Sequence, residues 1–135
     1  AVSEMYLKTV RMLGELGFRQ YEISNFAKEG YESRHNTKYW KLVPYLGIGK
    51  SAHSFWNGKR FYYDENMQFV SDGDGGSDSE RIMLGLRLAE GIDKSLVKKP
   101  YQEFVAMGLM KETESRIALT PKGMLVSNSV INALI

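Results

Sequence analysis

The chain has 135 residues, of which 43% are hydrophobic and 25% charged, enough for one globular domain or two small ones. It contains no cysteine, which excludes disulfides, thiolate nucleophiles and cysteine-based iron–sulfur or zinc sites; this agrees with a reducing compartment, and we expect a cytoplasmic location. The net charge of +2 is too balanced to indicate nucleic acid or an anionic membrane as a partner. No apolar run reaches the roughly 18 residues of a membrane span.

A helix followed by a strand is expected at the start of the chain. Ser3 and Glu4 suit the start of a helix, and Gly17 suits its end. Residues 21–26 then alternate between apolar and polar side chains, which predicts one short strand with one buried face. The apolar residues on one face of the helix are Val2, Tyr6, Val10 and Leu13.

The middle of the chain is rich in aromatic and polar residues. Residues 28–44 predict a long loop, and long ordered loops are often functional. Residues 45–55 predict one interrupted strand or two short ones. The dipeptide Asn57-Gly58 predicts a tight hairpin turn, which would place residues 55–56 opposite residues 60–63.

Residues 71–79 contain no apolar side chain and consist of Gly, Asp, and Ser, so we predict a linker between two domains, 1–70 and 80–135. The second domain is predicted to fold as helix, helix, hairpin and helix, which is a winged-helix-like plan. Its expected elements are a helix that begins with the capping-box pair Ser77 and Glu80 and ends at Gly91, a helix at 100–107, a hairpin of 110–111 with 117–119, and a last helix that begins with Thr120 and Pro121.

The densest chemistry lies around the first of the two histidines. His35 and Asn36 are followed closely by Tyr39 and Trp40. Aromatic rings can stack on a flat ligand while an imidazole ligates or hydrogen-bonds, so this combination favours a ligand site. The alternative is a structural histidine in a loop that the aromatic side chains pin to the rest of the molecule.

The second histidine follows a pair of glycines. Gly47 and Gly49 lie in a run that resembles a phosphate-binding loop and also fits a loose dinucleotide fingerprint. We reject both interpretations, because Pro44 replaces the first glycine of the phosphate loop and no long helix follows. The glycines instead suit a close approach of the backbone to a ligand or to another strand.

Several short runs, in order over most of the chain, form a family pattern. They are residues 17–27, 33–36, 39–40, 45–49 and 51–54, followed by residues 83–87, 91–93, 108–110 and 119–123. The first five runs resemble the later part of the oxygen-independent coproporphyrinogen III oxidase-like proteins, which are radical S-adenosylmethionine proteins. The last four resemble the C-terminal domain of the same family.

The resemblance implies an α+β fold and a role in haem metabolism. Residues 1–70 would be the last helix and strands of a partial (β/α) barrel, and residues 80–135 a winged-helix-like accessory domain. The motif His-Asn-x-x-Tyr-Trp resembles the haem chaperone branch of the family, which implies a tetrapyrrole partner. The implied haem contacts are His35, as a candidate iron ligand, with Asn36, Tyr39 and Trp40; the implied wall of the S-adenosylmethionine and substrate cavity is Gly47, Gly49, Ala52 and His53.

The family's cluster motif, Cys-x-x-x-Cys-x-x-Cys, has no counterpart in this chain. The 4Fe–4S cluster therefore cannot bind here, no catalytic residue is assigned, and we expect the chain to be the C-terminal part of a longer protein whose N-terminal domain holds the cluster. Two alternatives stay open. The longer protein would be a true oxidase that decarboxylates coproporphyrinogen III to protoporphyrinogen IX, or residues 80–135 would bind DNA as a winged helix.

Overall fold

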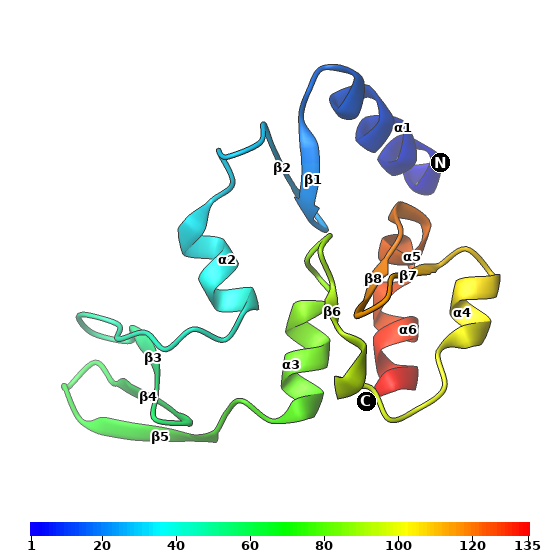
Figure 1. Ribbon diagram of the computed structural model, residues 1–135. Helices are drawn as coiled ribbons and strands as arrows, with labels where there is room; N and C mark the ends of the chain where they lie inside the picture. Colours follow the sequence, from blue (N-terminus) through cyan, green and yellow to red (C-terminus); the bar gives the residue numbers. More distant parts are fainter.

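The computed structural model describes residues 1–135 and has a mixed α/β fold (Figure 1). Six α-helices, one short 3-10 helix and eight strands are present, and the strands form three small sheets with no closed barrel. None of the helices has the length and apolar character that a membrane span needs. The chain is thus built from small units that pack side by side.

Helix α1 (Val2–Glu15) confirms the first predicted helix, and Gly17 follows it at φ +89°. Its predicted inner face is half-buried at Tyr6, Val10 and Leu13. Val2, also predicted on that face, is 80% exposed because it occupies the first turn, beyond the end of the packed surface. No residue of α1 is fully buried.

The single strand predicted at 21–26 is wrong, because the chain forms a two-stranded hairpin instead. Strands β1 (Arg19–Glu22) and β2 (Asn25–Ala27) pair antiparallel. The turn between them is fixed by long-range hydrogen bonds on Ile23: its N–H donates to the carbonyl of Arg87 at 3.0 Å, and its carbonyl accepts the hydroxyl of Tyr6 at 2.7 Å.

The loop predicted at 28–44 is also wrong, because it contains helix α2 (Arg34–Trp40). Ser33 caps this helix: its hydroxyl oxygen accepts the N–H of Asn36 at 3.3 Å. Figure 1 shows α2 between the β1–β2 hairpin and the next sheet.

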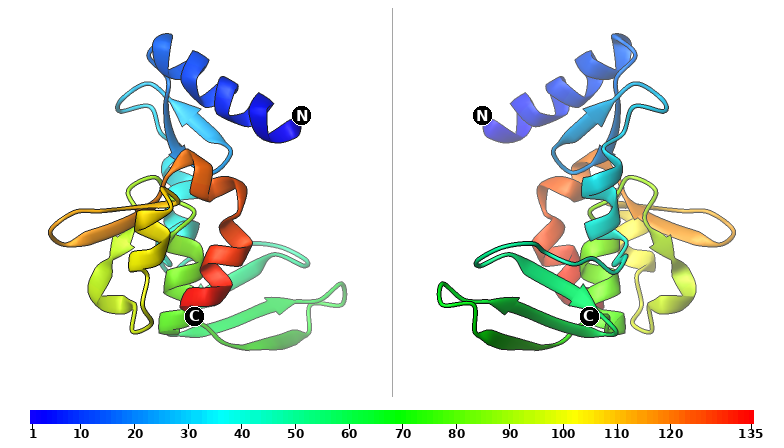
Figure 2. Two further views of the ribbon diagram at one scale, coloured as in Figure 1. Left: turned by 90° about the vertical axis from the view of Figure 1, so that its right-hand side faces the viewer. Right: turned by 90° about the vertical axis from the view of Figure 1, so that its left-hand side faces the viewer.

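The second sheet has the order β3-β4-β5 and is antiparallel throughout. The Asn57-Gly58 turn is confirmed: both residues have positive φ, and Phe55 lies opposite Arg60. Residues 45–55 were predicted as one interrupted strand or two short ones; only the last three belong to β3, and Tyr45 forms an isolated bridge to Phe55. Figure 2 shows this sheet projecting away from the helices. Its strands are β3 (His53–Trp56), β4 (Lys59–Tyr63) and β5 (Phe69–Asp74).

Much of the predicted linker 71–79 is ordered in regular elements. Strand β5 continues to Asp74, and helix α3 (Asp78–Gly85) begins four residues later. The cap predicted for α3 is confirmed, because the hydroxyl of Ser77 accepts the N–H of Glu80 at 3.2 Å. The helix ends at Gly85 rather than near Gly91, since the next residues leave it to bond with β1. The division of the chain into two domains stays a prediction.

The C-terminal region follows the predicted order of elements, but it has an added strand, an added 3-10 helix and a break in the last helix. A strand that was not predicted, β6, adds to the hairpin and gives a sheet of order β6-β8-β7. The last helix breaks at Val126, although Thr120 and Pro121 start it as predicted: the Thr120 hydroxyl accepts the N–H of Gly123 at 3.1 Å. The elements are β6 (Ile92–Asp93), a 3-10 helix (Lys94–Leu96), α4 (Gln102–Ala106), β7 (Met110–Glu112), β8 (Arg116–Leu119), α5 (Pro121–Leu125) and α6 (Ser127–Leu134).

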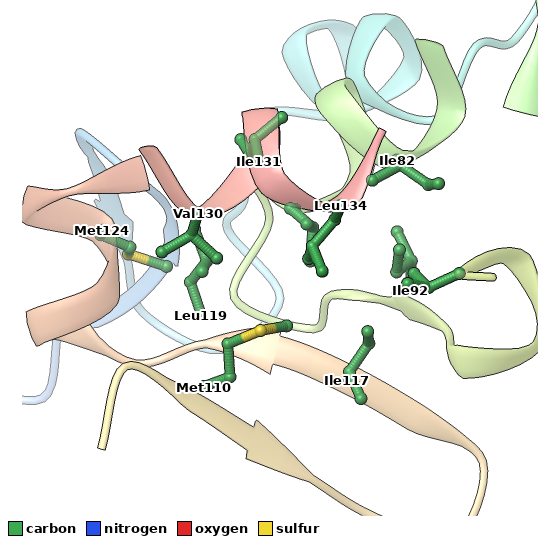
Figure 3. Packing of buried hydrophobic residues seen from close by; sticks show 11 residues of the cluster. Ile82, Ile92, Met110, Ile117, Leu119, Met124, Val130, Ile131 and Leu134 are labelled. Carbon is green, nitrogen blue, oxygen red and sulfur yellow. The ribbon is translucent and has the colours of Figure 1, made fainter. Parts of the chain in front are cut away.

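The hydrophobic core belongs entirely to this C-terminal region (Figure 3). From the N-terminal region, Tyr6 and Ile23 pack against it as partly buried side chains. Its eleven buried members are Ile82, Leu86, Ile92, Val97, Met110, Ile117, Leu119, Met124, Val130, Ile131 and Leu134.

Candidate functional site

Helix α2 and the segment after it present a short row of rings, which we call the ring row: His35 and Tyr39 on the helix, and Tyr45 beyond its end. His35 and Tyr39 lie one helical turn apart, with the histidine Nε2 and the tyrosine hydroxyl 3.1 Å from each other. The two rings meet edge to face at 4.8 Å, and Tyr39 meets Tyr45 in the same way at 4.7 Å. His35 is exposed, so its Nδ1 is open to a ligand while Nε2 is held by Tyr39.

The other two residues of the predicted haem motif have different surroundings. Asn36 is exposed, and its backbone N–H donates to the Ser33 hydroxyl that caps α2. Trp40 is turned toward the C-terminal region, where the guanidinium of Arg87 lies over its ring, 4.5 Å from the centroid. One face of the indole is therefore covered by the Arg87 guanidinium. Through this contact Trp40 attaches the end of α2 to the C-terminal region.

A cavity of about 290 Å³ lies beside the ring row, where α2, β3, β4 and α3 meet. Its lining is mostly apolar and aromatic, which is the usual character of a small-molecule site. Its polar groups include the ion pair between Arg60 and Glu80. The lining residues are Tyr39, Trp40, Leu42, Tyr45, Phe55, Arg60, Glu80 and Leu84.

The second predicted segment is organised mainly by contacts within itself. A Cβ atom on Gly47 would lie 2.4 Å from the carbonyl oxygen of His53, so the glycine serves a close approach of the chain to its own backbone. Gly49 has φ +98° and stands in a turn. Ala52 is half-buried just before β3. The two glycines predicted to line a cofactor cavity are thus also explained by the local course of the backbone.

The two histidines have separate partners. His53 packs on Tyr62 with ring centroids 4.8 Å apart, and its Nδ1 lies 3.5 Å from a carboxylate oxygen of Asp72. His35 contacts only members of the ring row among the aromatic side chains. No group of three or more His, Cys, Asp or Glu side chains is placed to hold a metal ion.

Sequence reasoning missed two residues beside the site, Glu22 and Arg87. Glu22 is 1% exposed, and its carboxylate accepts from the Arg87 guanidinium at 3.1 Å. Burial raises the pKa of nearby Tyr6, a hydrogen bond from Gln20 lowers it, and the Glu22 carboxylate raises it as a smaller cause. Glu22 and Arg87 are 65 positions apart, so no local pattern could have paired them.

Comparison with known proteins gives a family for the C-terminal region. A family model described as "HemN C-terminal domain" matches residues 79–126, from α3 to the residue after α5. Residues 79–126 carry a HemN C-terminal domain. The predicted resemblance is confirmed: the chain corresponds to the C-terminal, HemN/HemW-like portion of such proteins.

The relatives extend this similarity beyond the HemN C-terminal domain. "Heme chaperone HemW" of Bacillus subtilis is 29% identical over 98% of this chain and 42% of its own length. The protein of the same name in Synechocystis is 36% identical over 67% of this chain and 26% of its own length. "Radical S-adenosyl methionine domain-containing protein 1, mitochondrial" of Bos taurus is 53% identical over 38% of this chain and 12% of its own length.

The chain spans less than half the length of these relatives. No solved structure matched it. A chain without cysteine offers no thiolate for the 4Fe–4S cluster of a radical S-adenosylmethionine protein.

Proposed function

We propose that this chain is the C-terminal part of a longer radical S-adenosylmethionine protein that binds haem and delivers it to other proteins. The observation that carries the proposal is the exposed imidazole of His35, which stands in the ring row on α2. The similarity to proteins named heme chaperones over nearly the whole chain supports the choice of ligand. The imidazole of histidine is the commonest protein ligand for a metal centre.

In this proposal His35 ligates the haem iron, and the ring row with Asn36 surrounds the macrocycle. The hydroxyl of Tyr39 lies against Nε2 of His35, so Nδ1 would be the nitrogen that meets the ligand. The edge-to-face rings of Tyr39 and Tyr45 offer an apolar wall for a flat ligand. Trp40 has one face under Arg87 and also lines the cavity beside the ring row, so it holds the helix and would still contact a ligand in that cavity.

The finer features of the fold belong to the same proposal. Residues 1–70 would complete a (β/α) barrel in the longer protein, residues 71–79 would connect the domains, and residues 80–135 would form a winged-helix-like accessory domain. Gly47, Gly49, Ala52 and His53 would line the S-adenosylmethionine and substrate cavity of that barrel. The names of the relatives do not favour the oxidase or the DNA-binding alternative.

The test is a titration of the chain with hemin, followed by absorbance. We expect a Soret band that saturates and that is lost in His35→Ala. His53→Ala is the matched comparison, because it removes the other histidine, and we expect it to keep the band. A Soret band that survives in His35→Ala but disappears in His53→Ala would move the site to β3, and no saturable band in the unaltered chain would contradict haem binding by these residues.

A further inference from the structure

Glu22, Arg87 and Trp40 form a three-membered stack that joins the two regions of the molecule. Glu22 lies on β1, Trp40 ends α2, and Arg87 follows α3. The guanidinium donates to the buried Glu22 carboxylate at 3.1 Å and lies 4.5 Å from the centroid of the Trp40 ring. The other carboxylate oxygen of Glu22 accepts from its own turn, from the N–H of Ser24 at 3.3 Å and from the side chain of Asn25.

Arg87 is fixed by its backbone on both sides. Its carbonyl accepts the N–H of Ile23 at 3.0 Å, and the N–H of Ala89 donates to the carbonyl of Tyr21 at 2.9 Å. Leu88, between them, bridges to Glu22 in the antiparallel sense. The segment after α3 therefore lies along β1 like an added strand, and from this segment the Arg87 guanidinium reaches over the Trp40 ring.

We propose that Arg87 is a positioning residue for His35, and that it acts through Trp40; this inference rests on the haem-binding function proposed above. Trp40 is at the end of the same two-turn helix that carries His35 near its start. A short helix is marginal by itself, so its place is set by what its side chains contact. The contact of Trp40 with Arg87 ties α2 to the HemN C-terminal domain and thereby sets where the imidazole stands.

The role requires an arginine. A planar guanidinium can lie flat on an indole and still donate in its own plane to a carboxylate, whereas the point charge of a lysine cannot do both at once. The Glu22 carboxylate is buried, and a buried carboxylate without a cation is strongly unfavourable. The residue at position 87 must therefore keep its ion pair with Glu22 while it contacts Trp40. Arg87→Lys should therefore fail to replace the wild-type residue even though the charge is kept.

The experiment compares Arg87→Lys with Arg11→Lys, an exposed arginine on α1 that makes no ion pair or ring contact. Two quantities are measured: hydrogen exchange of the α2 amides, and the affinity for hemin from the Soret band. We expect Arg87→Lys to raise α2 exchange and to weaken hemin binding, each by about tenfold, while exchange in strand β8 stays unchanged. Arg11→Lys should leave all three quantities as they are.

Each other outcome overturns a separate part of the account. Unchanged α2 exchange in Arg87→Lys would refute the positioning role, whether or not the chain binds hemin. Faster α2 exchange with unchanged hemin affinity, in a chain whose Soret band still depends on His35, would show that the position of α2 does not matter for the ligand. Equal acceleration in β8 would make Arg87 a general stabilising residue. Absence of hemin binding in the unaltered chain refutes the proposed function alone, since the exchange measurement still tests the stack.

Discussion

The two regions of this molecule differ in how they are held together. Of the nineteen buried residues, sixteen lie in residues 78–135 and only Glu22, Ser54 and Phe55 lie in residues 1–77. The region with the core carries the HemN C-terminal domain, and the region without one carries His35 and the ring row. The candidate site is therefore formed by elements that bury few residues of their own and that pack against the C-terminal region.

Individual hydrogen bonds, ion pairs and ring contacts, rather than a shared buried core, make that connection. The hydroxyl of Tyr6 lies 3.5 Å from the sulfur of Met124, Glu22 pairs with Arg87, and Arg60 pairs with Glu80. Large apolar side chains are meanwhile left exposed in the N-terminal region, with Ile48 at 95% the extreme case. Since buried apolar area is the main source of stability, the C-terminal region should set the stability of the whole chain.

The largest expected effect follows from removing core volume. Ile117→Ala should lower the free energy of unfolding by about 2–5 kcal/mol, because Ile117 is 0% exposed in the core cluster and a cavity would remain. Both regions should then unfold at lower denaturant concentration, as measured by circular dichroism. Ile48→Ala is the matched control and should change the free energy by less than about 0.5 kcal/mol. A comparable loss in Ile48→Ala would break the contrast between the regions.

A second contrast concerns two glycines with positive φ. Gly91→Ala should cost more than about 3 kcal/mol, because its Cβ would lie 1.9 Å from the carbonyl oxygen of Ile117 and φ is +68°. Gly30 has φ +85°, but no atom lies within 4 Å of the position that a Cβ would take. For Gly30→Ala we therefore expect only backbone strain, which lowers the stability by about 1 kcal/mol. Thermal unfolding of both variants measures the difference, and equal losses would mean that the close approach at Gly91 relaxes without cost.

Two helix caps give a smaller and more specific contrast. Thr120→Ala removes the acceptor for the N–H of Gly123 and a donor to the carbonyl of Gly108, which should cost about 1 kcal/mol of global stability. Ser33→Ala removes the equivalent acceptor on α2. We expect this variant to fray α2 in hydrogen exchange and to leave the global transition in place. A global shift in Ser33→Ala as large as that in Thr120→Ala would show that α2 is part of the cooperative core.

The smallest effect is a pH dependence at the contact of α1 with the rest of the molecule. Burial raises the pKa of Tyr6 above that of an unfolded tyrosine, so the folded state favours the protonated phenol. The resulting stability is fully present below about pH 10 and is lost as the pH rises through the folded pKa. The stability difference between the unaltered chain and Tyr6→Phe should therefore stay constant up to about pH 10 and shrink as the pH rises further, whereas exposed Tyr31→Phe should show no such trend. A constant difference for Tyr6→Phe would contradict this reasoning.

Local signals in the sequence predicted the C-terminal region well. The Ser77 and Thr120 caps and the hairpin of β7 with β8 were found because each depends on neighbouring residues. The same holds for the Asn57-Gly58 turn in the N-terminal region. The break at Val126 was missed because no glycine or proline marks it.

The N-terminal region was predicted less well because distant contacts shape it. The turn at Ile23 contains no glycine or proline, and it is held by Arg87 and Tyr6. Helix α2 was taken for a loop because the segment around it is polar and aromatic. The motif around His35 was recognised as a candidate site from its residue types, but Trp40 contacts an arginine 47 positions away, which no local pattern shows.

The most direct test is native-state hydrogen exchange of the unaltered chain. It measures whether the C-terminal region is more stable than the N-terminal region, which carries the candidate site. Amides in β8 and α6 should exchange only by global unfolding, and amides in α2 should exchange through local opening at a lower free energy. If the α2 amides were as protected as those of β8, the site would belong to the same cooperative core and the claim would be wrong.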